Sequence, residues 1–441
     1  MIVHRAFPVT PPPPVHRGLL IPVGTGRNGI IICCGFKHFS LNPEKPHVRL
    51  LVKFRQVSFM IKKLRIRNFK SLLDTQSELS PLTVLIGRSG TGKTNFVQGL
   101  RTLQGLLSAG GPQPYNDLLH SLGGWGTLGP AGLEKFTASW EIVFDVNGME
   151  GDYRYILEIQ GHSTFQPQSV PVKREYLSLA GKTLFEWADG KWVTEPTVKI
   201  QPRQSVLLGW LTAIPEINIA YLTLTRGIGC YDFPANILAS QTGQSPDLGF
   251  GFKPDGSNYL SIIDGILGNL QSLKTWREIE AAIKKLSASV QGLTTAPFQS
   301  ERITVSYQFG GQFVDLPLSQ QSGGFRRFLA HLLAIYQQPP KQVVVFEEPE
   351  NGIFPGALTM LGDFMRAANE KLSTQFILTT HSPQLLDAFD ADSIRVVDIS
   401  NEGTKIGPLD PEQRAAVKDN LLSPAELLTV TQAAMARSTG V

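Results

Sequence analysis

A short glycine-rich segment, GRSGTGKT at residues 87–94, constrains the fold more than any other part of the chain. It fits the pattern G-x-x-x-x-G-K-[ST] in full. The apolar run PLTVLIG (81–87) leads into it, and TNFVQGLRTLQGLLSA (94–109) follows with apolar residues at helical spacing. A strand, a glycine-rich loop and a helix in this order place backbone N–H groups and a helix N-terminus around one point, which favours a bound phosphate. The alternative, a glycine-rich turn that arose by chance, does not explain this context.

The residues of this loop are expected to have different roles in binding a nucleotide. Lys93 is expected to reach the β- and γ-phosphates of a nucleotide, and Thr94 is expected to ligate Mg²⁺. The glycines let the backbone wrap around the phosphates. The predicted nucleotide contacts are Gly87, Arg88, Ser89, Gly90, Thr91, Gly92, Lys93, Thr94 and Asn95.

A second segment, VVVFEEPENGIFPG (343–356), ends an apolar strand in two adjacent glutamates. Burying an unpaired carboxylate is unfavourable, and neighbouring residues of a strand point to opposite sides, so the two side chains are expected to differ in role. We expect Glu347 to hold Mg²⁺, directly or through water, and Glu348 to polarise an attacking water. The alternative is a strand that runs into a solvated acidic turn.

Two further segments complete the predicted site. LTTHSP (378–383) places His381 after a third buried strand, where it can contact the γ-phosphate and the attacking water. QSGGFRRF (321–328) begins a predicted helix at Ser322, Gly323 and Gly324, whose hydroxyl and N–H groups can bind a phosphate. Because the first loop already holds one, this second site is predicted to meet a phosphate on another subunit. The alternative is a capped helix that follows a glycine turn.

These four segments occur in the order found in ABC-type ATPase heads, which the chain resembles over residues 60–400. The opening MIKKLRIRNFKSL resembles the RecF, SMC and OLD branch rather than transporter ATPases. The EEPENG and TTHSP segments are similar to those of compact ATPases, many of them linked to prophage, toxin–antitoxin or anti-phage loci. The resemblance implies an α/β P-loop NTPase fold, an ABC-type head with an antiparallel β-subdomain and a helical insertion. It also implies use of ATP and Mg²⁺ and a head-to-tail dimer.

The sequence departs from the family pattern at several positions. Glu347 stands where an aspartate is usual, Arg88 and Ser89 replace an Asn-rich pair, and Phe354 replaces a histidine. The glutamine of a Q-loop has only positional candidates, Gln166 and Gln168. A nuclease-type acidic or His-Asn-His set is not evident after residue 400, so any associated nuclease is expected on another chain.

Domain boundaries follow from the same patterns. The two core segments are expected to come together around an inserted β-rich region and a helical insertion. The predicted parts are a basic Pro/Gly-rich extension (1–59), the ATPase core (60–110 and 300–410), the β-rich subdomain (111–257), the helical insertion (258–299) and a helical tail (411–441).

Charge and composition restrict the partners. The net charge is +4, but residues 1–59 carry +7, with eight Lys and Arg and one acidic residue, and the remaining residues carry −3. The extension is interpreted either as a basic arm that touches nucleic acid or as a start-site artefact with Met60 as the natural start. With 42% apolar residues the chain can form a core, no apolar run is long enough to span a membrane, and three scattered cysteines fit a reducing cytoplasm.

The sequence predicts an ATP-hydrolysing switch that forms a dimer or an assembly of dimers and acts on DNA or on a separately encoded effector nuclease or toxin. A basic set on an expected edge strand could bind DNA or be a solvated face: Lys62, Lys63, Arg65, Arg67 and Lys70. The rival interpretation is a slow or non-hydrolysing scaffold that holds a toxin. A transporter ATPase is disfavoured, because no Q-loop is assigned and the opening segment is of the other branch.

Overall fold

The computed structural model describes residues 58–108, 118, 122–162, 172–197, 208–234, 236, 251–268, 272–295 and 303–436. The compact unit that contains them spans Arg55–Val441. The predictions for the basic extension and for Gln166 and Gln168 therefore lie outside the described residues.

A six-stranded sheet carries the glycine-rich loop, the acidic segment and the switch segment found in the sequence. Its strands run in the order β16-β15-β3-β14-β13-β9, and all neighbours are parallel except β15 and β16. Strands β3, β14, β13 and β9 are short apolar runs buried on both faces, as expected for a parallel sheet covered by helices. Their bounds are β3 (Leu82–Ile86), β9 (Ile228–Tyr231), β13 (Val343–Glu347), β14 (Gln375–Thr379), β15 (Ile394–Ser400) and β16 (Gly403–Pro408).

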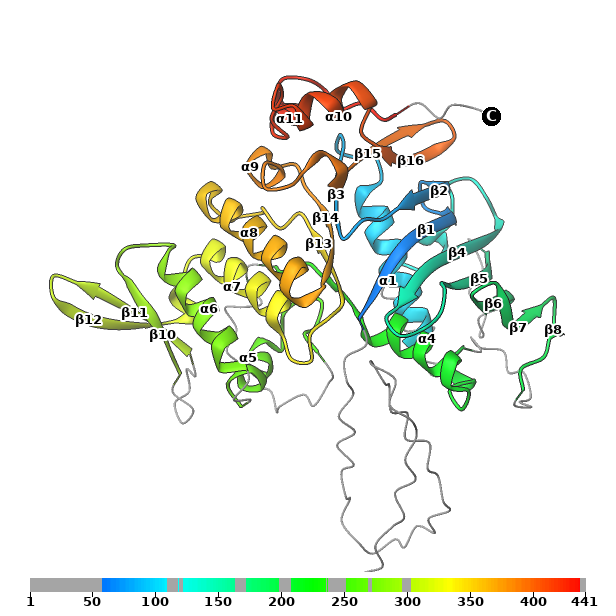
Figure 1. Ribbon diagram of the computed structural model, residues 1–441, viewed down its shortest axis with the longest axis horizontal. Coiled ribbons are helices and arrows are strands. Elements are labelled where there is room, and N and C mark those ends of the chain that lie inside the picture. Colours follow the sequence, from blue (N-terminus) through cyan, green and yellow to red (C-terminus); the bar gives the residue numbers. More distant parts are fainter. Residues whose placement is uncertain are drawn as a thin grey trace, which may run out of the picture. The chain divides into compact units, whose positions relative to one another are not determined.

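Two hydrophobic cores lie on the two faces of this sheet. Val344 and Phe346 of β13 point into the core formed by α7 (Gly323–Tyr336) and α8 (Pro355–Leu372), whereas Val343 and Val345 point into the core that contains α1 (Lys93–Ser108) and α4 (Pro215–Arg226). Figure 1 shows α1 on one side of β13 and β14 and α7 and α8 on the other. Each fully buried aliphatic side chain contributes about 1.5–3 kcal/mol, so the alternation along β13 fixes which helices cover which face.

The second core is closed by a seven-stranded antiparallel sheet in the order β2-β1-β4-β5-β6-β7-β8. The prediction that the basic opening segment is an edge strand is wrong, because β1 pairs with β2 on one side and with β4 on the other. The bounds are β1 (Phe59–Phe69), β2 (Leu72–Glu78), β4 (Lys135–Val146), β5 (Tyr153–His162), β6 (Val172–Leu179), β7 (Lys182–Ala188) and β8 (Lys191–Thr194). A short helix, α3 (Trp125–Leu128), precedes β4.

The insertion between β9 and α7 combines helices with a small sheet. Helices α5 (Tyr259–Leu267) and α6 (Leu273–Lys284) pack under α7, and the segment from residue 290, predicted as helix, is instead strand β10 (Val290–Thr295). It pairs with β11 (Ile303–Phe309), which pairs with β12 (Gln312–Pro317). The hairpin of β11 and β12 leads directly into the N-terminus of α7.

The C-terminal part folds back toward the parallel sheet. Helix α9 (Pro383–Leu386) follows β14, and α10 (Pro411–Lys418) and α11 (Glu426–Thr429) follow β16. Met435 forms a bridge with Leu409, so the last described residues lie along the end of β16. In the described part of the chain, no helix combines the length and apolarity needed to cross a membrane.

Candidate nucleotide-binding site

The carboxyl ends of the parallel strands bring the predicted site residues to one edge. Glu347 lies opposite Thr379, Phe346 lies opposite Tyr231, and Thr379 lies opposite Leu85 near the end of β3. The loops that follow β3, β9, β13 and β14 therefore emerge side by side. Ligands of open α/β sheets bind at this edge.

The glycine-rich loop runs from the end of β3 to the first residue of α1. Gly92 has φ of 103°, in the left-handed region, and a Cβ there would lie 2.2 Å from Thr404 Oγ1. Glycine is therefore required both by the backbone and by the close approach of a neighbouring strand. Arg88, Ser89 and Gly90 are exposed, so the outer part of the loop is open to a ligand.

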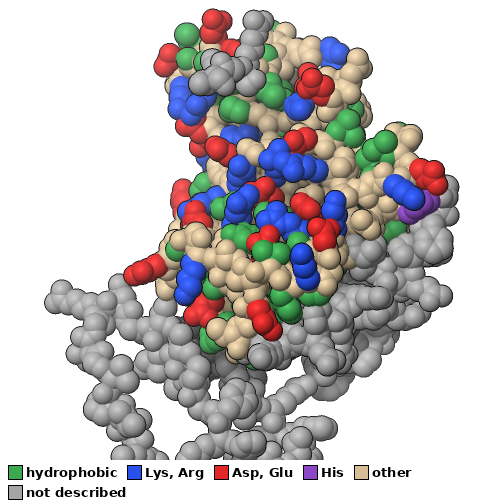
Figure 2. All heavy atoms as spheres, turned by 90° about the vertical axis from the view of Figure 1, so that its right-hand side faces the viewer, with side chains coloured by type: hydrophobic (Ala, Val, Ile, Leu, Met, Phe, Trp, Pro, Cys, Tyr) green, Lys and Arg blue, Asp and Glu red, His purple; other side chains and the backbone are tan. Residues whose placement is uncertain are grey.

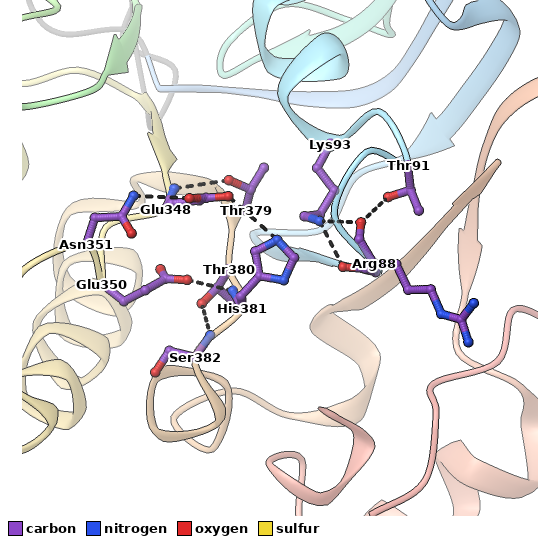
Figure 3. Close-up of polar contacts among 11 residues, drawn as sticks. Arg88, Thr91, Lys93, Glu348, Glu350, Asn351, Thr379, Thr380, His381 and Ser382 are labelled. Atoms are coloured by element: carbon purple, nitrogen blue, oxygen red, sulfur yellow. Dashed lines mark hydrogen bonds and ion pairs between the residues drawn. The ribbon is translucent and has the colours of Figure 1, made fainter. Parts of the chain in front are cut away.

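Lys93 is buried, with 5% of its surface exposed, at the first turn of α1. Its Nζ donates to the carbonyl oxygens of Gly87 (2.8 Å) and Arg88 (3.0 Å), as Figure 3 shows. Burial lowers the pKa of Lys93, and the nearby Glu348 and Glu350 carboxylates raise it. The ammonium group thus lies within the loop, where phosphate oxygens can replace the two carbonyls as its partners.

A network of hydroxyl groups supports the loop from behind. Thr404 of β16 is fully buried, and its Oγ1 donates to the carbonyl of Thr91 (2.8 Å) and shares a hydrogen bond with Ser71 Oγ (2.8 Å). Ser71 in turn accepts from the Asn95 amide (2.8 Å), so the Asn95 side chain serves the loop's support here. Thr91 closes the loop by donating to the Arg88 carbonyl at 2.9 Å.

Glu347 and Thr94 form the predicted metal-binding pair. Burial raises the pKa of the Glu347 carboxyl, hydrogen bonding from Thr94 lowers it, and the carboxylates of Asp232 and Glu348 raise it further. Thr94 is exposed at the same edge of the sheet. A cation bound here would relieve the repulsion among these carboxylates.

These residues fit Mg²⁺ in the way that nucleotide sites hold it. Among the described residues, no group of three or more His, Cys, Asp and Glu side chains could hold a metal by itself. Mg²⁺ is usually bound by one or two protein oxygens together with waters and substrate phosphates. Thr94 and Glu347 supply such a pair, and the ion would neutralise the phosphate charge there.

Glu348 has an unusual backbone and three oriented contacts. Its φ is 42°, in the left-handed region that non-glycine residues rarely adopt. Residues with such a backbone occur preferentially at functional sites. Its backbone N–H donates to the carbonyl (3.2 Å) and the Oγ1 (3.1 Å) of Thr379. One carboxylate oxygen accepts from the Asn351 amide (3.1 Å), and the other lies 3.6 Å from His381 Nε2. Glu348 and His381 thus face each other across the two loops (Figure 3).

The switch segment after β14 is held by neighbours on both sides. Thr380 N–H donates to the Leu85 carbonyl (3.2 Å), and Ser382 N–H donates to Thr380 Oγ1 (2.9 Å). The N–H of His381 donates to Glu350 Oε1 at 2.6 Å. The backbone N–H groups of residues 380–382 are therefore all hydrogen-bonded, and this ordered loop holds the His381 imidazole at the site.

The predicted second phosphate site lies at the N-terminus of α7. Ser322 is the N-cap, exposed, and its hydroxyl accepts from Phe325 N–H at 3.1 Å. Gly324 packs against the turn after β13, where an added Cβ would lie 2.3 Å from the Gly352 carbonyl oxygen. Arg327 donates to the carbonyls of Phe233 (2.8 Å) and Asn351. The start of α7 is thus joined to the loops beside Glu348, although α7 and α1 cover opposite faces of the sheet.

Several members of the basic set predicted for DNA are paired with carboxylates. Arg65 binds Asp74 through two hydrogen bonds (2.7 and 2.6 Å), Arg67 approaches the same carboxylate, and Lys62 binds Asp152 at 2.6 Å. Figure 2 shows Lys and Arg side chains with Asp and Glu side chains among them. Lys70 lies elsewhere: its Nζ donates to Gln98 Oε1 (2.6 Å), and it is close enough to Glu347 for that carboxylate to raise its pKa, which burial lowers.

Three residues at the site were not assigned from the sequence. Asp232 directly follows β9, a strand that lies beside β13 but is separated from it by more than 100 residues of sequence. The signal was present in IGCYDF, an apolar run that ends in an acid, but it stood within a region read as a β-rich subdomain. Glu350 and Asn351 belong to the quoted acidic segment, and their roles depend on the turn that brings them back toward Glu348 and His381.

Two family models match the chain. One is described as an AAA domain, putative AbiEii toxin, Type IV TA system, and matches residues 249–387; the other is described as an AAA ATPase domain and matches residues 60–107. Together they cover both halves of the site, the glycine-rich loop in one match and the segments from Ser322 to His381 in the other. No curated protein matches the sequence.

Solved structures of SMC heads share the fold. A crystal structure of the SmcHead bound to the C-winged helix domain of ScpA is 18% identical, with a TM-score of 0.50 over 80% of this chain and 99% of that chain. An Smc head domain with an extended coiled coil, bound to the C-terminal domain of ScpA and derived from Pyrococcus furiosus, is 14% identical, with a TM-score of 0.51 over 82% and 99%. At these identities the likeness concerns the fold. The chain thus has the fold of these heads, and two of its segments match models of AAA ATPase domains.

Proposed function

We propose that this ATPase is a switch in which ATP joins two copies head to tail and hydrolysis separates them. One observation carries the proposal. The P-loop precedes α1 on one face of the parallel sheet, and Ser322, an exposed N-cap, begins α7 on the other face. A phosphate held by the P-loop can meet such a helix N-terminus only on a second copy, and two copies related by a twofold axis would complete two sites.

Within each site, the residues of this chain divide the chemistry. Lys93 and the loop N–H groups bind the phosphates, and Thr94 and Glu347 hold Mg²⁺. Glu348 orients and deprotonates the attacking water, while His381 contacts the γ-phosphate side of that water. Ser322 of the other copy stabilises the same phosphate.

The switch acts on a separate partner. The family model that matches residues 249–387 is described as an AAA domain, putative AbiEii toxin, Type IV TA system, which supports a place in a toxin–antitoxin system, with a separately encoded effector as the partner. The SMC heads of similar fold are described as bound to ScpA, which supports a protein partner in general. DNA remains a second partner to test, although the ion pairs of Lys62, Arg65 and Arg67 leave less basic charge for phosphate contacts than the sequence indicates.

The rival function is a nucleotide-bound scaffold that sequesters a toxin without turnover. The contacts of Glu348 favour hydrolysis. A scaffold that does not hydrolyse ATP has no need of a left-handed backbone at Glu348 or of a carboxylate that faces His381. A phosphate-release assay on the purified wild-type protein separates the two: multiple turnovers support the switch, and ATP bound without phosphate release supports the scaffold.

The decisive experiment combines two variants. Glu348→Gln should still bind Mg-ATP, because Lys93, Thr94 and Glu347 remain, and hydrolysis should fall by a factor on the order of 10² or more. The trapped ATP should then increase the dimer population, measured by light scattering with ATP.

Adding Ser322→Arg to Glu348→Gln should abolish this association and leave ATP binding to the P-loop nearly intact. Ser257→Arg, which places the same side chain at another exposed serine, is the matched control and should leave the dimer in place. A double variant that associates as well as Glu348→Gln alone would exclude α7 from the interface.

A further inference from the structure

Glu350, the third glutamate of the acidic segment, links the two loops that carry the proposed catalytic pair. Its Oε1 accepts the backbone N–H of His381 at 2.6 Å, across 31 residues of sequence. Its Oε2 is buried and has no hydrogen-bond partner among the described residues. Figure 3 shows the Glu350 side chain extending from the turn after β13 to the backbone of the switch loop.

The contact with Glu350 orients the backbone N–H of His381, which the rest of the switch loop does not hold. The N–H of Thr380 is held by the carbonyl of Leu85, and that of Ser382 by the hydroxyl of Thr380. The N–H of His381 points out of the loop, and the bond to Glu350 determines its direction. Because the N–H lies in the rigid plane of the peptide unit that ends at the His381 Cα, the same bond also fixes the point from which the imidazole side chain extends.

The turn that carries Glu350 is also held by hydrogen bonds. Glu350 sits in a turn in which Asn351 N–H donates to the Glu348 carbonyl (3.1 Å), Ile353 N–H donates to the Glu350 carbonyl (3.0 Å), and the Asn351 amide donates to Glu348 Oε2. Movement of the Glu350 backbone would therefore also move Glu348. The Glu350 carboxylate thus adds a link between the turn of Glu348 and the loop of His381, beyond the bonds from Glu348 N–H to Thr379 at the end of β14. The His381 Nε2 lies 3.6 Å from Glu348 Oε1.

We propose that Glu350 is a positioning residue that holds His381 in register with Glu348 through the hydrogen bond from Glu350 Oε1 to the His381 backbone. The inference rests on the roles proposed above for Glu348 and His381. It requires the length and the acceptor oxygen of the side chain, and it does not require the negative charge.

Two variants separate these requirements. Glu350→Gln keeps the reach and an acceptor oxygen and removes the charge, so kcat should stay within about threefold of wild type. Glu350→Asp keeps the charge and shortens the side chain by one methylene, so kcat should fall about 10- to 100-fold, the scale expected when a reacting group is misplaced by about 1 Å. In Glu350→Asp the Kd for Mg-ATP, measured by calorimetry, should stay within about threefold, because the P-loop contacts and the charge near Lys93 are unchanged. Glu370→Asp, at an exposed position of α8, is the matched control.

A second measurement does not depend on hydrolysis. In protein labelled with ¹³C-histidine, the imidazole signal of His381 is assigned by its absence from His381→Gln. With a non-hydrolysable ATP analogue bound, this signal should shift in Glu350→Asp and keep its wild-type position in Glu350→Gln.

The proposal is overturned if Glu350→Gln loses as much kcat as Glu350→Asp, because charge would then be the required property. It is equally overturned if Glu350→Asp keeps the wild-type kcat or the wild-type His381 signal. A wild-type protein that binds ATP and releases no phosphate would instead contradict the proposed function, and the His381 signals would still decide whether Glu350 positions the loop.

Discussion

Lys341 places an ammonium group in the interior beside the start of β13. Its Nζ donates to the carbonyl of Arg226 at 2.7 Å, and burial lowers the pKa of Lys341 to about 8. In the unfolded chain the pKa returns to 10.5, so between these values the unfolded state binds more protons than the folded state. Stability therefore rises with pH across this window, since the penalty for burying the charge disappears as the folded group loses its proton.

The variant Lys341→Met lacks this titration. The free energy of unfolding of the wild type minus that of Lys341→Met should increase by about 1–2 kcal/mol from pH 7.5 to pH 9.5. Urea unfolding of both proteins at the two pH values measures the difference, in which the titration of shared tyrosines cancels. A difference that does not change with pH would mean that the pKa of Lys341 is not lowered in the folded protein.

At the residue scale, the sequence predicted the groups that belong to contiguous motifs, and the structure brings Lys93, Thr94, Glu347, Glu348 and His381 to one edge of the sheet. Their chemical roles stay predictions. Asp232 could not be assigned, because its place depends on β9 pairing with β13, a contact made by tertiary structure. The left-handed backbone of Glu348 was equally hidden, since nothing in the letters EEPENG demands it.

The hairpin of β15 and β16 acts as a support for the P-loop. Thr404 reaches the loop through its hydroxyl, and its backbone is fixed in turn, because its N–H donates to the Ser71 carbonyl (2.8 Å) and its carbonyl accepts from Thr75 Oγ1 (2.6 Å). This support could not be predicted from the sequence, because Thr404 in GTKIGP resembles any other threonine of a strand.

We expect Thr404→Val to weaken ATP binding about tenfold, the effect of losing 1–2 kcal/mol of hydrogen bonding that holds the loop ready for phosphate. Thr404→Ser should keep the wild-type Kd. Thr102→Val is the matched control, since it removes a buried hydroxyl bonded only within α1 (Thr102 Oγ1 to the Gln98 carbonyl, 2.8 Å) and should affect stability more than Kd. Calorimetric Kd values that are equal for Thr404→Val and Thr102→Val would contradict the support role.

Two elements differed from their predictions for the same physical reason. The basic alternation of β1 is typical of a strand with one solvated face, and it does not reveal whether the strand has one neighbour or two. Residues 290–295 continue an apolar spacing compatible with a helix, but pairing with β11 makes them a strand. Long-range pairing decided both cases, whereas α1 and α7 were predicted well because their periodicity is local.

At the scale of the whole molecule, the sheet that closes the second core begins just before Met60. Phe59 is 3% exposed and packs edge-on against Phe144, with ring centroids 6.4 Å apart, and Asn147 N–H donates to the Ser58 carbonyl at 2.8 Å. A chain that starts at Met60 would lack these contacts, and burial of one phenylalanine contributes about 1.5–3 kcal/mol.

We therefore expect a chain of residues 55–441 to match the full sequence in ATP turnover and melting temperature. A chain of residues 60–441 should turn over ATP as well and melt a few degrees lower, measured by scanning calorimetry. Equal melting temperatures for the two shortened chains would show that Phe59 contributes nothing to stability.

The placement of the P-loop and Ser322 on opposite faces of one sheet has a genetic consequence. If each ATP site takes its P-loop from one copy and its serine from the other, then a Lys93→Ala chain and a Ser322→Arg chain fail for complementary reasons. Each is inactive alone, yet a mixed pair contains one site built from the undamaged half of each chain. Random pairing in a cell that expresses both alleles should restore about a quarter of the wild-type sites, so two null alleles of this gene would complement each other.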